Sequence, residues 1–97
     1  MSLSNSPEAF YSNLKNKLYE TSHWPAKYLF KFIVKSNPEQ ILQIEQIFDN
    51  MGAVINIIPS KKGTYTSISI HVEMKDPESV INKYKQVGAA VKDVISL

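Results

Sequence analysis

The sequence predicts an α+β fold in which a strand–helix–strand unit occurs twice. A helix-start signal at residues 37–39 (Asn-Pro-Glu) returns at residues 76–78 (Asp-Pro-Glu), each time with a side-chain cap before a proline at the first helical position. Gly52 and Gly88 follow the two predicted helices, and glycine accepts the left-handed conformation in which many helices end. Alternating apolar residues, typical of strands, flank both helices.

A separate helix is predicted before these units, over residues 6–20. Ser6 is its candidate cap and Pro7 its first helical residue, as is common at helix starts. Its apolar residues recur at every fourth position, which places them on one helix face: Phe10, Leu14 and Leu18. This face is expected to pack on the body of the protein.

The first strand is predicted over residues 27–35. One set of alternate positions is wholly apolar and consists of Tyr28, Phe30, Phe32 and Val34. The other set mixes lysines with Leu29 and Ile33. Because both faces carry apolar residues, this strand is expected to lie centrally in the sheet.

The middle of the chain is predicted to form a helix and a β-hairpin. The helix, residues 38–51, carries one apolar stripe: Ile41, Ile44, Ile47, Phe48 and Met51. Strands over 53–59 and 64–74 follow, joined by the short loop 60–63 (Ser-Lys-Lys-Gly) in which Gly63 supplies a positive φ. On the second of these strands one face is apolar: Ile68, Ile70, Val72 and Met74.

The last unit is predicted as a helix over 77–87, stopped at Gly88, and a strand over 89–97. Right-handed crossovers and the central hairpin place the four strands in an antiparallel sheet of order 4-1-3-2, with both helices of the units on one face. This is the ferredoxin-like split βαβ arrangement, with residues 1–97 as a single domain and its core at 26–97. The other sheet face stays open, and function in this fold usually lies there, at the edges or in loops.

Composition excludes several classes of protein. The 97 residues include no cysteine, and all 11 basic residues are lysine in a chain of net charge +2. Disulfides, thiol catalysis and cysteine metal sites are therefore excluded, which suits a reducing compartment. No apolar run approaches about 20 residues and the N-terminal stretch lacks signal-peptide features, so a cytoplasmic protein with no membrane association is expected.

Several of these segments resemble a known family. The segment WPAKYLFKFIV, a following helix and the hairpin SKKGTYTSISI with Ser60, Gly63, Tyr65, Ser67 and Ile68 are similar to the YbeD-like family of small uncharacterised bacterial proteins. The leading FYSNLKNKLYETSHWP looks like its extended Bacteroidetes-type branch, and the resemblance covers residues 8 to 97. It implies a ferredoxin-like fold similar to small-molecule regulatory (ACT-like) domains. It implies no activity.

The hairpin and its second strand hold the candidate ligand-binding residues: Ser60, Lys61, Lys62, Gly63, Tyr65, Ser67, Ser69 and His71. A phosphate loop needs several converging N–H groups at a helix start, whereas this loop has one glycine and leads into a strand, so a solvated hairpin tip is the favoured interpretation. The hydroxyls and His71 are expected on the open face, where a ligand, a partner or water contacts them.

Nucleic-acid binding and catalysis are disfavoured. An RNA-recognition strand alternates aromatics after a basic residue and glycine, but aligning Lys62 and Gly63 on that pattern puts Thr64, Thr66 and Ser69 at the aromatic positions. The two histidines, His23 and His71, have no carboxylate at a spacing that indicates a triad or a metal site. We therefore expect no enzyme activity, no cofactor and no metal.

Three apolar residues are candidate interaction sites. Trp24 is expected to anchor the N-terminal helix together with the apolar face of that helix, or else to be a contact for a partner. Leu29 and Ile33, joined by Val54 and Ile58, form an apolar surface on the open face that either the extra helix or another copy of the chain covers. A homodimer is accordingly predicted.

The sequence thus favours a non-catalytic binding or regulatory module that takes a small-molecule effector or regulates a partner enzyme. The alternative is a protein-interaction adaptor without a ligand, which uses Trp24 and the N-terminal helix. A nucleic-acid-binding domain is the third hypothesis.

Overall fold

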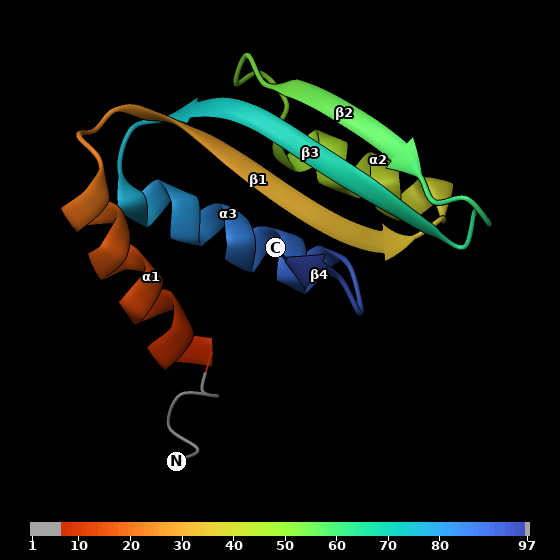
Figure 1. Ribbon diagram of the computed structural model, residues 1–97, viewed down its shortest axis with the longest axis horizontal. Helices are drawn as coiled ribbons and strands as arrows, with labels where there is room; N and C mark the ends of the chain where they lie inside the picture. Colours follow the sequence, from red (N-terminus) through yellow and green to blue (C-terminus); the bar gives the residue numbers. More distant parts are fainter. Residues whose placement is uncertain (1–6, 97) are drawn as a thin grey trace.

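The computed structural model describes residues 7–96, which form three helices and four strands (Figure 1). In chain order the elements are α1 (Pro7–Thr21), β1 (Ala26–Lys35), α2 (Pro38–Ile47), β2 (Val54–Pro59), β3 (Tyr65–Met74), α3 (Pro77–Ala90) and β4 (Ile95–Ser96). This is the predicted strand–helix–strand repeat preceded by one helix. Ser6, the predicted cap of the first helix, lies outside the described residues.

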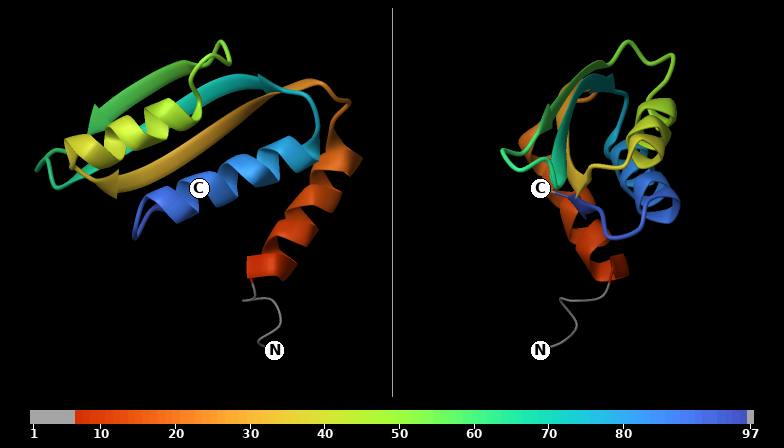
Figure 2. Two further views of the ribbon diagram at one scale, coloured as in Figure 1. Left: turned by 180° about the vertical axis from the view of Figure 1, so that it is seen from behind. Right: turned by 90° about the vertical axis from the view of Figure 1, so that its right-hand side faces the viewer.

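The four strands form one antiparallel sheet of order β2-β3-β1-β4, which is the predicted order 4-1-3-2 read from the other edge. The α+β, ferredoxin-like arrangement is therefore confirmed. β1 pairs with β3 along its full length, from Ala26 opposite Met74 to Lys35 opposite Tyr65. Helices α2 and α3 both cover the same face of the sheet (Figure 2), as right-handed crossovers require.

An aromatic cluster fills the space between the sheet and these two helices. Phe30 and Phe32 project from β1 with no exposed surface, and Phe48 lies 4.9 Å from the Phe30 ring. Tyr84 of α3 meets Phe30 edge-on at 5.1 Å, and its hydroxyl lies 2.8 Å from the hydroxyl of Tyr28. Burial and this hydrogen bond raise the pKa of Tyr84, so its hydroxyl stays protonated and has a partner inside the core.

Both predicted core-helix starts are confirmed. The side chain of Asn37 accepts a hydrogen bond from the backbone N–H of Glu39 at 2.9 Å. The carboxylate of Asp76 accepts two, from the backbone N–H and the hydroxyl of Ser79, and these bonds hold its pKa below the usual range. Each cap satisfies N–H donors that have no partner within the helix.

The predicted ends of the two core helices need correction. α2 stops at Ile47, and turns lead from there to Gly52, which has the expected positive φ of 70°. Gly88 is not a stop, because α3 continues through it to Ala90 and the next positive φ falls on Asp93. Alanines favour helix over the left-handed conformation, and burial of Val91 fixes the helix end.

The longer α3 leaves little chain for the last strand. The predicted strand over 89–97 is reduced in the described residues to Ile95–Ser96, which pairs with Ile33 and Phe32 of β1. Within the described part of the chain, most of the outer edge of β1 therefore has no neighbouring strand (Figure 1).

Helix α1 lies beside α3 at one end of the sheet and leaves the open face uncovered (Figures 1 and 2). The Tyr19 hydroxyl donates to the carboxylate of Glu78 at 2.5 Å, and the indole N–H of Trp24 donates to the carbonyl of Leu18 at 3.1 Å. Leu18 is buried, as predicted, but Phe10 is 54% exposed and is not an anchor. The prediction that the extra helix covers the open face is therefore wrong.

The Tyr19 contact gives a pH-dependent prediction. Its hydrogen bond to Glu78 raises the pKa of Tyr19 from 10.0 to about 12, so the contact stabilises the fold fully below pH 10 and loses this effect as the pH rises through about 12. Glu78→Gln is expected to return the Tyr19 pKa toward 10, measured by NMR titration of its ring carbons. Glu8→Gln, an exposed change on α1, is the control. Equal titration of Tyr19 in both variants would contradict the assignment.

Candidate functional site

The open face is the side of the sheet turned away from α2 and α3. Residues on β1 and β3 alternate between this face and the core, as the pleat requires. By strand register, the open face consists of Lys27, Leu29, Lys31, Ile33 and Lys35 of β1, Tyr65, Ser67, Ser69, His71 and Glu73 of β3, Val54, Asn56 and Ile58 of β2, and Ile95 of β4.

Apolar residues on the open face fall into two rows that run across the strands. In the first row His71 lies between Leu29 and Val54. In the second row Ile58, Ser67, Ile33 and Ile95 are opposite one another across all four strands. Leu29 is 47%, Val54 61%, Ile58 63% and Ile95 51% exposed. The two exposed apolar rows are separated by Lys31, Ser69 and Asn56, and no element among residues 7–96 lies over them.

Each row borders a shallow hollow. One hollow, of about 500 Å³, is lined by Leu29, Val54 and His71 together with the opposed charges of Lys27 and Glu73. The other, of about 380 Å³, is lined by Ile33, Ile58, Pro59, Ser60, Tyr65 and Ser67. Both volumes lie within the range of small-molecule sites.

The predicted ligand residues are therefore divided between the hairpin loop and the open face, and they do not form one site. Ser60, Tyr65 and Ser67 line one hollow, and His71 lines the other. Tyr65 and His71 stand six residues apart on β3, which corresponds to about 20 Å along a strand. Ser69 lies between the two hollows, opposite Lys31 and Asn56.

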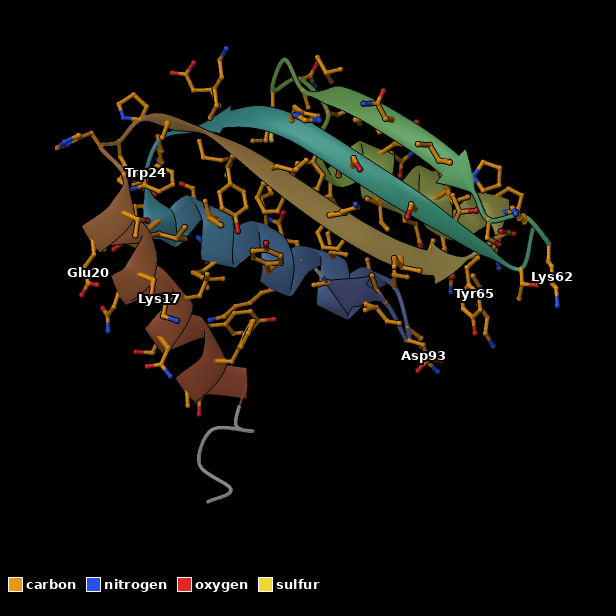
Figure 3. The ribbon with its side chains drawn as sticks, viewed as in Figure 1. Lys17, Glu20, Trp24, Lys62, Tyr65 and Asp93 are labelled. Carbon is orange, nitrogen blue, oxygen red and sulfur yellow. The ribbon has the colours of Figure 1, made fainter. Side chains whose placement is uncertain are left out.

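The hairpin residues Ser60 and Gly63 have a structural role. The backbone N–H of Gly63 donates to the Ser60 carbonyl at 2.9 Å, and Gly63 has a φ of 74°. The Ser60 hydroxyl accepts from the backbone N–H of Tyr65 at 3.2 Å. Turn closure thus accounts for the serine and glycine of the motif. The backbone N–H groups of Ser60, Gly63 and Tyr65 are engaged within the hairpin. Lys61 and Lys62 are exposed, and Figure 3 shows Lys62 at the tip.

The face lacks the stacking residues of an RNA-recognition sheet. Thr66, at one of the compared positions, is only 3% exposed and lies on the core side, where its hydroxyl is 2.7 Å from that of Ser36. Among the described residues of the open face, the aromatic side chains are Tyr65 and His71, and neither occupies a position compared with the RNA-recognition pattern. Thr66 therefore cannot present a side chain to a ligand on the open face.

The interaction candidates separate in the structure. Leu29 and Ile33 lie on the open face as predicted, whereas Trp24 is half-buried beside α1 and uses its N–H within the chain. The sequence analysis did not single out Ile95, which extends the second apolar row. Val94 packs against the core, and because successive residues of a strand point to opposite faces, this would have indicated that Ile95 lies on the open face.

Two further observations concern the described part of the chain. Among residues 7–96 no group of three or more histidine and acidic side chains is placed to hold a metal ion. No helix in this range is both long and apolar enough to cross a membrane.

Comparison with known proteins supports the resemblance carried by the hairpin. The chain is 27% identical over 78 residues to a UPF0250 protein of Edwardsiella ictaluri, covering 77% of this chain and 90% of the relative. UPF0250 protein YbeD of Escherichia coli O1:K1 and that of Shigella boydii serotype 18 match with the same identity and coverage. No family model and no solved structure matches. The chain is thus similar to the YbeD-like uncharacterised proteins, and the assignment to a Bacteroidetes-type branch stays a prediction.

Proposed function

We propose that this relative of the YbeD-like proteins is a non-catalytic binding module that uses the open face to take a small-molecule effector or to regulate a partner enzyme. The observation that carries the proposal is the uncovered apolar surface of Leu29, Val54, Ile58 and Ile95. Large exposed apolar side chains gathered on one face of a monomer favour an interaction at that face. The two hollows add room for ligand-sized groups beside hydroxyl and imidazole donors.

An adaptor without a ligand is the second candidate, and the open face supports it better than Trp24 does. The Trp24 indole N–H already donates to Leu18 and its ring packs against the core, which are properties of a structural anchor. An adaptor of this kind binds a partner protein through the open face. The predicted homodimer stays a prediction.

The proposal is tested by NMR titration of the labelled protein with the small-molecule fraction of a lysate of its host. Saturable shifts are expected at open-face amides such as those of Leu29 and Ile58. Ile58→Ser is expected to weaken binding about tenfold to a hundredfold, since burying an isoleucine contributes about 1.5–3 kcal/mol. Leu42→Ser is the matched control, because Leu42 is 52% exposed on α2, behind the sheet.

Two further variants separate the candidates. Ser67→Ala and Tyr65→Ala are expected to abolish the response to an effector in the second hollow, and to leave an adaptor's partner binding largely intact. Shifts confined to α2 and α3, or equal losses in the Ile58 and Leu42 variants, would contradict use of the open face.

A further inference from the structure

Charge on the open face is one-sided. Lys27, Lys31 and Lys35 alternate along β1 with Leu29 and Ile33, and all three lysines are exposed. The hairpin tip adds two more exposed lysines, residues 61 and 62. Glu73 is the one carboxylate among the face residues, and it stands opposite Lys27. The rest of the sequence holds six lysines and eight carboxylates, so positive charge is concentrated on this side of the molecule.

This pattern selects between the possible occupants of the face. A second copy packed face to face would bring two lysine rows together, which is unfavourable because like charges repel. Single-stranded nucleic acid favours platforms of successive aromatic rings on which bases stack, whereas the two rings of this face, Tyr65 and His71, stand six residues apart and the exposed apolar side chains are aliphatic. Aliphatic side chains flanked by carboxylates would satisfy both the apolar rows and the lysines.

We propose that the open face binds an acidic amphipathic helix of a partner protein. This inference rests on the proposed function and names the chemistry of its partner. A helix is the element that covers an exposed sheet face in α+β proteins, and its diameter of about 10 Å spans two to three strands.

The spacing of the face fits such a helix. The two apolar rows cross β1 at Leu29 and Ile33, four residues or about 13 Å apart, which corresponds to between two and three helical turns. The lysines repeat at the same interval between and beside the rows. Apolar side chains two to three turns apart on one stripe reach both rows, while glutamates bordering that stripe reach Lys31 and Lys35.

The experiment uses a synthetic 20-residue helix with a leucine stripe bordered by glutamate, labelled for fluorescence anisotropy. Two matched peptides carry glutamine or lysine in place of glutamate. The glutamate peptide is expected to bind at least tenfold more tightly than either, and more weakly as salt increases. Lys31→Glu with Lys35→Glu is expected to weaken its binding at least tenfold. Lys75→Glu with Lys92→Glu, both exposed and off the face, is the control and is expected to leave binding unchanged.

Several outcomes would overturn the inference. If the glutamine peptide binds as tightly as the glutamate peptide, and Ile58→Ser still abolishes that binding, the acidic preference is wrong but the proposed function stands. If no peptide binds, the inference of an acidic helix is also overturned. The lysate titration then decides on the proposed function, which survives if open-face amides shift and fails if they do not. Retention of poly-uridine but not of peptide assigns the lysines to nucleic acid. A concentration-dependent dimer abolished by Ile58→Ser, without peptide binding, assigns the face to a second copy.

Discussion

Phe30→Ala is expected to reduce the free energy of unfolding by about 3–5 kcal/mol, the range for removing a fully buried phenylalanine. The Phe30 ring has no exposed surface and contacts the rings of Phe32, Phe48 and Tyr84. Because domains of this size are stable by about 5–15 kcal/mol, the variant is expected to lose a large fraction of its stability. Urea denaturation followed by circular dichroism measures the change.

The neighbouring position supplies the control. Leu29 is 47% exposed on the opposite side of β1, so Leu29→Ala is expected to change stability by less than about 0.5 kcal/mol. Similar losses for the two variants would contradict the division of β1 into a core side and an open face. That division underlies every functional proposal for this chain.

Trp24→Ala is expected to cost about 2–3 kcal/mol and to loosen α1. The ring packs against the core, and truncation removes both this contact and the hydrogen bond from its N–H to the Leu18 carbonyl. Proteolysis within α1 is expected to become faster in this variant, because the helix then opens more often. Urea denaturation and limited proteolysis measure the two effects.

Two variants check the cause of this effect. Trp24→Phe keeps an aromatic ring but not the N–H donor, and is expected to lose about 1 kcal/mol. Phe10→Ala, on the same helix at a 54% exposed position, is expected to be nearly neutral. Wild-type stability of Trp24→Ala, together with loss of a bound partner, would instead favour the adaptor that uses this tryptophan.

Local signals explain why most elements were predictable. Asn37 and Asp76 cap α2 and α3 in the structure, since a cap and the proline after it act on the adjacent turn. Gly63 turns the hairpin with the expected positive φ, because few other residues adopt it at low cost. Gly88 misled the prediction, since glycine permits a helix end without requiring one.

The candidate site was predictable only as a face. Alternation along β1 and β3 places Leu29, Ser67 and His71 together on the open side, because the strand period is two. Their division between two hollows depends on β2 and on strand register, which the sequence of β3 does not contain.

The sequence by itself determined the repeat of strand, helix and strand, the sheet order and the residues that point to the core, because caps, turns and periodicity act within a few residues of the chain. Tertiary structure decided where α1 lies and how short β4 is. It also decided how the four strands place lysines and exposed apolar side chains together on one face. These features depend on contacts between distant segments, such as Tyr19 with Glu78 and Ile95 with Ile33. Such contacts form through packing and register, to which local propensity contributes little.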